Sequence, residues 1–127
     1  MPSVLVVDDS KVMREMIIAC LQLVAALEVT QASSGLEAIE KLSLGRYDLL
    51  VLDLNMPDIG GLEVIEFVRG QNKLRSLPIL IVTTRGDDAS RSAVIAAGAS
   101  RFLAKPFTPD ALFGEVSRLL EGGGATA

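Results

Sequence analysis

The 127-residue chain contains no histidine and no tryptophan. Without histidine it has no imidazole general base, no histidine metal ligand and no residue that could become a phosphohistidine. Any phosphoryl donor of that kind would have to be another molecule. The single cysteine, Cys20, cannot form an internal disulfide, and its helical apolar surroundings are typical of a small core residue. A lone cysteine fits a reducing compartment, so we expect a cytoplasmic protein.

Long apolar runs and an excess of positive charge are also missing. No stretch reaches the ~20 apolar residues of a membrane-spanning helix, and the amino terminus lacks the basic-then-apolar pattern of a signal peptide. The 12 basic and 16 acidic residues give a net charge of -4. This balance argues against nucleic acid as a direct partner, because phosphate binding needs a basic face.

Short apolar runs alternate with longer amphipathic stretches along the chain. They predict five strands and five helices. The strands are expected near 4–7, 28–32, 49–52, 79–82 and 102–104, and the helices near 11–26, 34–44, 62–68, 87–97 and 108–121. The second strand is partly polar and is expected at a sheet edge. The alternation predicts an α/β fold, a (βα)₅ unit with a doubly wound parallel sheet, right-handed crossovers and helices on both faces.

The pattern indicates one domain over residues 1–121, with no internal repeat and no linker inside it. The glycine-rich residues 122–127 are expected to be a flexible tail or the start of a linker to a further domain. Ser34 and Glu37 form a capping-box pattern, in which each side chain would satisfy the other's free backbone amide.

Acidic residues end two of the predicted strands. Asp8 and Asp9 follow the first strand, and Asp53 follows the third. Ligands bind at the carboxyl edge of an open α/β sheet, so neighbouring strands would bring three carboxylates into one crevice. Such a cluster repels itself unless a cation fills it. We therefore expect a hard cation, together with chemistry on an anion.

Thr83 follows the fourth strand and Lys105-Pro106 follows the fifth, so they face the same crevice. With these residues in place, the chain closely resembles the response-regulator receiver family, of the chemotaxis single-domain type. The motifs that carry the resemblance are Val6-Val-Asp-Asp-Ser10, Asp53-Leu-Asn-Met-Pro-Asp58 with Gly61-Leu62, Val82-Thr83, Gly98-Ala-Ser100 and Lys105-Pro-Phe107. The resemblance covers residues 3–121 and implies the flavodoxin-like strand order 2-1-3-4-5.

The resemblance implies how the acids divide their roles. Asp53 would be the phosphoacceptor, and a strand-end carboxylate is a competent nucleophile toward a phosphoryl group. Asp8 and Asp9 would bind Mg²⁺, together with Asp53 itself and the backbone carbonyl of Asn55. All are oxygen donors, which suits this ion.

The residues after the last two strands would complete the switch. Lys105 would pair with Asp53 in the free protein and with the phosphoryl oxygen afterwards, and its bond to Pro106 is cis in the family. Thr83 would donate its hydroxyl to the phosphoryl group. Phe102 would be the switch aromatic, rotating from exposed to buried when Thr83 moves.

Two residues depart from the family pattern, which mostly has Ala or Gly after the switch hydroxyl. Thr84 is larger, and Arg85 adds a positive charge near the mouth of the site. We hypothesise that Thr84 and Arg85 slow access for the phosphodonor or the attacking water.

The implied function is a stand-alone phosphorylation switch rather than an enzyme acting on a separate substrate. A sensor histidine kinase would donate the phosphoryl group. An output protein would bind the face formed by the fourth helix, fifth strand and fifth helix, with Ser92, Ile95 and Phe102 among its contacts. A phosphatase is a further candidate partner. We expect no membrane insertion, and either a monomer or a phosphorylation-dependent dimer.

Two alternatives stay open. The first is a receiver fragment of a larger regulator with a DNA-binding or enzymatic output, which the glycine-rich tail would suit. The second is an aspartate-based phosphatase. It is disfavoured because such enzymes commonly have an aspartate two residues after the nucleophile, and this chain has Asn55 there.

Overall fold

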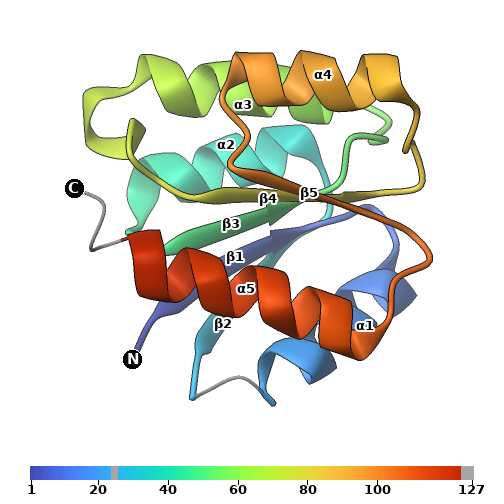
Figure 1. Cartoon of the computed structure of the whole chain (residues 1–127). Helices are drawn as coiled ribbons and strands as arrows, with labels where there is room; N and C mark the ends of the chain where they lie inside the picture. The colour runs from blue at the N-terminus through green and yellow to red at the C-terminus, as the bar shows by residue number, and fades with distance from the viewer. Residues whose placement is uncertain (24–25, 124–127) are drawn as a thin grey trace.

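The computed structural model describes residues 1–23 and 26–123, which form a parallel sheet covered by helices on both faces (Figure 1). The elements are β1 (Ser3–Val7), α1 (Lys11–Leu21), β2 (Glu28–Ala32), α2 (Gly35–Leu44), β3 (Leu49–Leu52), α3 (Gly61–Gly70), the 3₁₀ turn η1 (Asn72–Leu74), β4 (Ile79–Thr83), α4 (Asp88–Ala97), β5 (Arg101–Ala104) and α5 (Pro109–Gly123). The sheet order is β2-β1-β3-β4-β5, and all four neighbouring pairs are parallel. The predicted fold and strand order are therefore confirmed.

The central strands are buried on both faces. In β1, Leu5 and Val7 pack with the α2, α3 and α4 layer, whereas Val4 and Val6 pack with α1 and α5. The two layers lie on opposite sides of the sheet in Figure 1. Alternate side chains of a strand point to opposite faces, so a strand with a helix layer on each side must be apolar throughout. This explains the unbroken apolar runs that the sequence shows.

Helix α1 is shorter than its apolar periodicity predicts. It ends at Leu21, whereas the pattern favoured a helix to about residue 26. Leu21 is fully buried but Leu23 is 74% exposed, so the helix ends where its apolar contacts with the sheet end. Residues 24 and 25 lie outside the described part of the chain. None of the described helices is both long and apolar enough to cross a bilayer.

The start of α2 also differs in detail from its predicted capping box. The Ser34 hydroxyl accepts a hydrogen bond from the Glu37 amide at 3.1 Å, as expected. The Glu37 carboxylate, however, accepts from the amide and hydroxyl of Ser33, at 2.6 Å and 3.0 Å. These bonds lower the pKa of Glu37, the Ser33 backbone amide contributing most. The reciprocal bond thus reaches one residue further from the helix than the motif implies.

At the other end of the chain, α5 continues to Gly123, two residues beyond the predicted domain end. Thr108 caps the helix through a 3.1 Å bond from the Ala111 amide to its hydroxyl, and Pro109 occupies the first turn. The tail residues 124–127 lie outside the described part of the chain.

Candidate functional site

The carboxyl edge of the sheet brings the acidic residues of two neighbouring strands together. Val7 and Leu52 are register partners in β1 and β3, so Asp8 and Asp53 emerge side by side, and the Asp53 amide donates to the Val7 carbonyl at 3.0 Å. One carboxylate oxygen from each of Asp8, Asp9 and Asp53 lies within 4.8 Å of the other two. The convergence predicted from the sequence is present.

These acids differ in exposure. Asp8 is 1% and Asp53 5% exposed, whereas Asp9 is open to solvent. Asp8 is held on both sides of its carboxylate: the Ser10 amide donates to Oδ1 at 2.9 Å, and the Lys105 ammonium contacts Oδ2. No hydrogen bond or ion pair to the Asp9 carboxylate is found within residues 1–23 and 26–123. Asp9 is therefore free to bind an incoming ligand.

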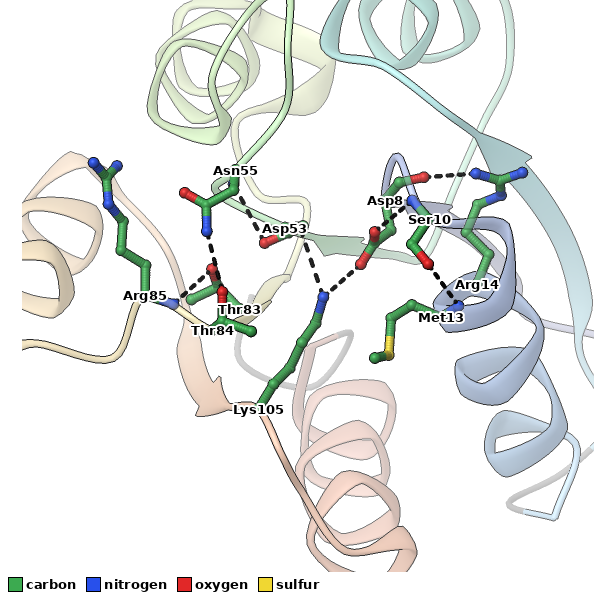
Figure 2. Close-up of polar contacts among 10 residues, drawn as sticks. All are labelled: Asp8, Ser10, Met13, Arg14, Asp53, Asn55, Thr83, Thr84, Arg85 and Lys105. Atoms are coloured by element: carbon green, nitrogen blue, oxygen red, sulfur yellow. Dashed lines mark hydrogen bonds and ion pairs between the residues drawn. The ribbon is translucent and has the colours of Figure 1, made fainter.

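The Lys105 ammonium lies between the two buried carboxylates (Figure 2). Its Nζ is 2.7 Å from Asp8 Oδ2 and 3.6 Å from Asp53 Oδ2. The predicted partner Asp53 is thus the more distant of the two. The Lys105–Pro106 peptide bond is cis, and the Lys105 amide donates to the Thr83 carbonyl at 2.8 Å. This backbone bond ties the end of β5 to the end of β4, so the lysine starts from a fixed position.

On the β4 side, a threonine pair forms the wall of the site. Thr83 is fully buried, and its hydroxyl accepts a 3.2 Å bond from the Arg85 amide. Thr84 is exposed, and its hydroxyl lies 3.3 Å from Asn55 Nδ2. The backbone N–H of Asn55 in turn donates to Asp53 Oδ1 at 3.3 Å. Figure 2 shows this contact of Thr84 and Asn55 beside Asp53, joining the loops that follow β3 and β4.

The loop that carries Asn55 is fixed by a glycine at the start of α3. A Cβ on Gly61 would lie 2.7 Å from the Asp53 carbonyl oxygen and 2.9 Å from Leu54 Cα. Since real Cβ atoms do not approach so closely, any side chain here would push the helix away from the site. This close approach gives a physical reason for a glycine in the Gly61-Leu62 motif.

Asp58 anchors the same loop to α2. Its two carboxylate oxygens accept the amides of Gly35 and Leu36 at 3.1 Å and 3.0 Å. The bond from the Leu36 amide, followed by others from the backbone, lowers the pKa of Asp58 to about 2. A carboxylate at a helix amino terminus is also favoured by the helix dipole. Asp58 therefore acts as a cap delivered from another segment of the chain.

Phe102, the expected switch aromatic, is already buried at 9% exposure. This differs from the exposed starting position predicted for the unmodified protein. The guanidinium carbon of Arg91, on α4, lies 5.4 Å from the centre of the ring, within the range of a cation–π contact. A phenylalanine has no hydroxyl to keep in water, so its ring can be covered in this way without leaving a polar group unpaired. Ser92 and Ile95, the other predicted contacts of this face, are exposed on α4.

The cluster fits a divalent cation by the chemistry of its donors. Three carboxylates converge, one of them unpaired and exposed, and no nitrogen or sulfur ligand is among them. Mg²⁺ prefers oxygen ligands and retains several waters, which an exposed crevice allows. The combination of a cation site, a buried carboxylate and an ammonium suits chemistry on a phosphoryl group.

Local patterns in the sequence did not predict the contacts of three side chains that build this region: Arg14, Asp58 and Arg91. Arg14 and Arg91 have partners on other elements, so no local pattern reveals them. Asp58 is an acid among turn formers, which is a partial indication of a structural role. Its helix partners Gly35 and Leu36 lie 23 and 22 positions earlier, so the sequence alone does not pair them with it.

Known proteins resemble this chain over most of its length. The response regulator receiver domain model matches residues 4–117. Chemotaxis protein CheY1 of Helicobacter pylori (strain J99) is 38% identical over 109 residues, 85% of this chain and 88% of that protein. A chemotaxis protein CheY homolog of Campylobacter jejuni (strain 81-176) is also 38% identical, over 85% and 84% of the two chains.

Among solved structures, chemotaxis protein CheY4 of Vibrio cholerae superposes with a TM-score of 0.87 at 38% identity. The match covers 94% of this chain and 99% of that one. A receiver domain protein of Methanospirillum hungatei reaches a TM-score of 0.91 at 21% identity, which is a likeness of fold.

Proposed function

The chain belongs to the response regulator receiver domain family, and we propose that it accepts a phosphoryl group on Asp53 from the phosphohistidine of a sensor kinase. The observation that carries the proposal is the convergence of Asp53 with two further acids and Lys105 at one sheet edge. The chain has no histidine, so the phosphohistidine must belong to the partner.

In the proposed transfer, an Asp53 carboxylate oxygen attacks the phosphorus atom. An O–P bond forms as the N–P bond to the donor imidazole breaks, and the leaving nitrogen takes a proton from solvent. The backbone N–H of Asn55 donates to Asp53 Oδ1 at 3.3 Å, and Lys105 lies beside Oδ2. The carboxylate is thus oriented before the donor arrives, which lowers the entropic part of the barrier.

Asp8 and Asp9, with Asp53 and the Asn55 carbonyl, would hold Mg²⁺. When bound, the cation neutralises charge on the transferring group. The fit rests on the oxygen-only donor set and on the unpaired Asp9 carboxylate. Asp8 begins with its oxygens committed to Ser10 and Lys105, so Lys105 would give up that contact and turn toward the phosphoryl oxygen.

The switch would involve Thr83 and the face beyond it. The Thr83 hydroxyl now accepts a bond from Arg85, and donating to a phosphoryl oxygen would draw the β4–α4 loop inward. Because Phe102 is already buried, the switch would depend on the packing of its ring against Arg91. It would not depend on a rotation of the ring from an exposed to a buried position. We propose the α4–β5–α5 face, with Arg91 and Ile95, as the surface that an output protein reads.

Thr84 and Arg85 are proposed to limit access to Asp53. Both are exposed beside the site, and the Thr84 hydroxyl is bonded to Asn55. A donor or an attacking water would have to pass this contact. A cytoplasmic location and action as a stand-alone switch complete the proposal. Stand-alone action is supported by the share of two chemotaxis proteins that the match covers, 88% and 84% of their length.

The test is direct labelling. The protein is incubated with acetyl phosphate and Mg²⁺, and intact mass is measured. We expect one added phosphoryl group in the natural protein, none in Asp53→Asn, and normal labelling in the control Asp48→Asn, an exposed acid that precedes β3. An unmodified natural protein, or a labelled Asp53→Asn protein, would refute the proposal.

A further inference from the structure

Arg14, on the first helix, contacts the residue that begins the acidic cluster. Its Nη1 donates to the backbone carbonyl oxygen of Asp8 at 2.7 Å. Its Nε donates to the Gln31 side-chain oxygen, on the edge strand β2, at 2.9 Å. Figure 2 shows Arg14 on the side of Asp8 opposite to Lys105. The guanidinium therefore touches the main chain of the site and none of its carboxylates.

This contact completes the fixing of Asp8. Its amide donates to the Ala32 carbonyl at 3.2 Å, and its carboxylate oxygens accept from Ser10 and Lys105. Arg14 takes the remaining acceptor, the carbonyl oxygen. A side-chain donor thus holds the first carbonyl beyond the end of β1.

The carbonyl matters because of the residue that follows. The Asp8 carbonyl and the Asp9 amide belong to one planar peptide unit. Holding the carbonyl oxygen fixes that plane, and the plane sets the direction in which Asp9 leaves the strand. Asp9 has no side-chain partner of its own among the described residues, so its placement depends on its backbone.

The second bond of Arg14 orients the guanidinium itself. Gln31 is exposed on β2 and holds Nε, so the planar fork is anchored at one edge while it donates from the other. A guanidinium presents donors in a fixed geometry, whereas the ammonium of lysine is a point donor. The arrangement is built for orientation as well as for charge.

We propose that Arg14 is a positioning residue for the divalent cation, which it serves by fixing the Asp8–Asp9 peptide. The proposal rests on the Mg²⁺ site put forward above. Partners of metal ligands typically contribute about 10-fold to 100-fold in metal affinity. We therefore expect Arg14→Gln to weaken Mg²⁺ binding about 10-fold.

The experiment measures the melting temperature of the intact chain against MgCl₂ concentration and takes an apparent Kd from the curve. Arg14→Gln should raise this Kd about 10-fold, with the metal-saturated protein still labelled by acetyl phosphate. Gln31→Ala keeps the charge of Arg14 and loses only the anchoring bond, and it should raise the Kd about threefold. Arg75→Gln, which removes a positive charge from an exposed position before β4, should leave the Kd unchanged.

Arg14→Lys separates position from charge, and only partial recovery of the natural Kd is expected. Full recovery would show that charge alone acts and would overturn the proposal. So would an unchanged Kd in Arg14→Gln with a lower melting temperature without metal, which would mark a purely structural role. If Arg14→Gln does not fold, an unchanged Kd in Gln31→Ala overturns it. Failure of the natural protein itself to respond to Mg²⁺ would instead remove the metal site and the proposal with it.

Discussion

Lys105 is closer to Asp8 than to Asp53: its Nζ lies 2.7 Å from the first carboxylate and 3.6 Å from the second. The side chains of Lys105, Asp8 and Asp53 are 9%, 2% and 6% exposed, so the ammonium is a largely buried counter-ion to two acids. The ammonium already neutralises part of the negative charge that a divalent cation would otherwise neutralise. Cation binding and the position of Lys105 should therefore be coupled.

Replacing this lysine should destabilise the protein in the absence of metal. Lys105→Met leaves Asp8 and Asp53 close together without a positive partner, and breaking a buried ion pair costs about 3–5 kcal/mol. Urea unfolding should show a loss of about 3 kcal/mol without Mg²⁺ and a smaller loss with it, because the cation takes over the neutralisation. The control is Lys41→Met. Its pair with Glu37 spans 3.9 Å between side chains that are about one-third exposed, and such pairs contribute less than about 1 kcal/mol. An equal loss with and without Mg²⁺ would contradict the coupling.

Mg²⁺ should stabilise the natural protein by binding the folded state alone. At a concentration of 100 times the Kd, linkage gives about 2.7 kcal/mol. We expect a rise of several degrees in melting temperature that Asp9→Ala abolishes, because Asp9 is the unpaired acid of the proposed metal site. Asp110→Ala, in the first turn of α5, should retain the full rise. A melting temperature independent of Mg²⁺ in the natural protein would rule out the metal site.

The cap that Asp58 provides for α2 predicts a defined pH dependence of the unfolding free energy. The pKa of Asp58 is lowered from 3.8 to about 2, chiefly by the Leu36 amide. Its contribution to stability is therefore fully present above the unfolded value of 3.8, and it is lost as pH falls through the folded value of about 2. Unfolding free energies of the natural protein and Asp58→Asn should differ by a constant amount above pH 4 (about the unfolded value) and converge toward about pH 2. A difference in unfolding free energy that does not narrow over this range would refute the capping role of Asp58.

Removing Thr84 should speed both phosphorylation and hydrolysis. Thr84→Ala deletes the 3.3 Å bond to Asn55 and the bulk beside Asp53. If opening this contact is part of the barrier, the loss of a bond worth about 1 kcal/mol corresponds to a rate increase of about fivefold. Rates with acetyl phosphate, and decay of the phosphorylated protein, provide the measurement. Thr84→Ser keeps the hydroxyl and should stay close to the natural rates, and unchanged rates in Thr84→Ala would exclude a role in access.

Much of the fold follows from local patterns. The apolar runs identify the strands because a strand buried on both faces must be apolar at every position. The cap Ser34 marks the start of α2 because its hydroxyl oxygen satisfies a free amide nearby in sequence. The predicted end of α1 was wrong because the pattern of apolar residues continues beyond the point where the sheet can cover them.

The sequence by itself placed Asp8, Asp9 and Asp53 at strand ends, and parallel topology then required those ends to meet at one edge. Tertiary structure decided which groups pair there. Lys105 and Asp8 are separated by 97 positions, and Arg14 reaches both Asp8 and Gln31 from another element. Such contacts depend on distances of a few ångströms between packed elements. No periodicity along the chain encodes those distances, so only the folded structure shows that Lys105 favours Asp8 and that Arg14 holds the peptide preceding Asp9.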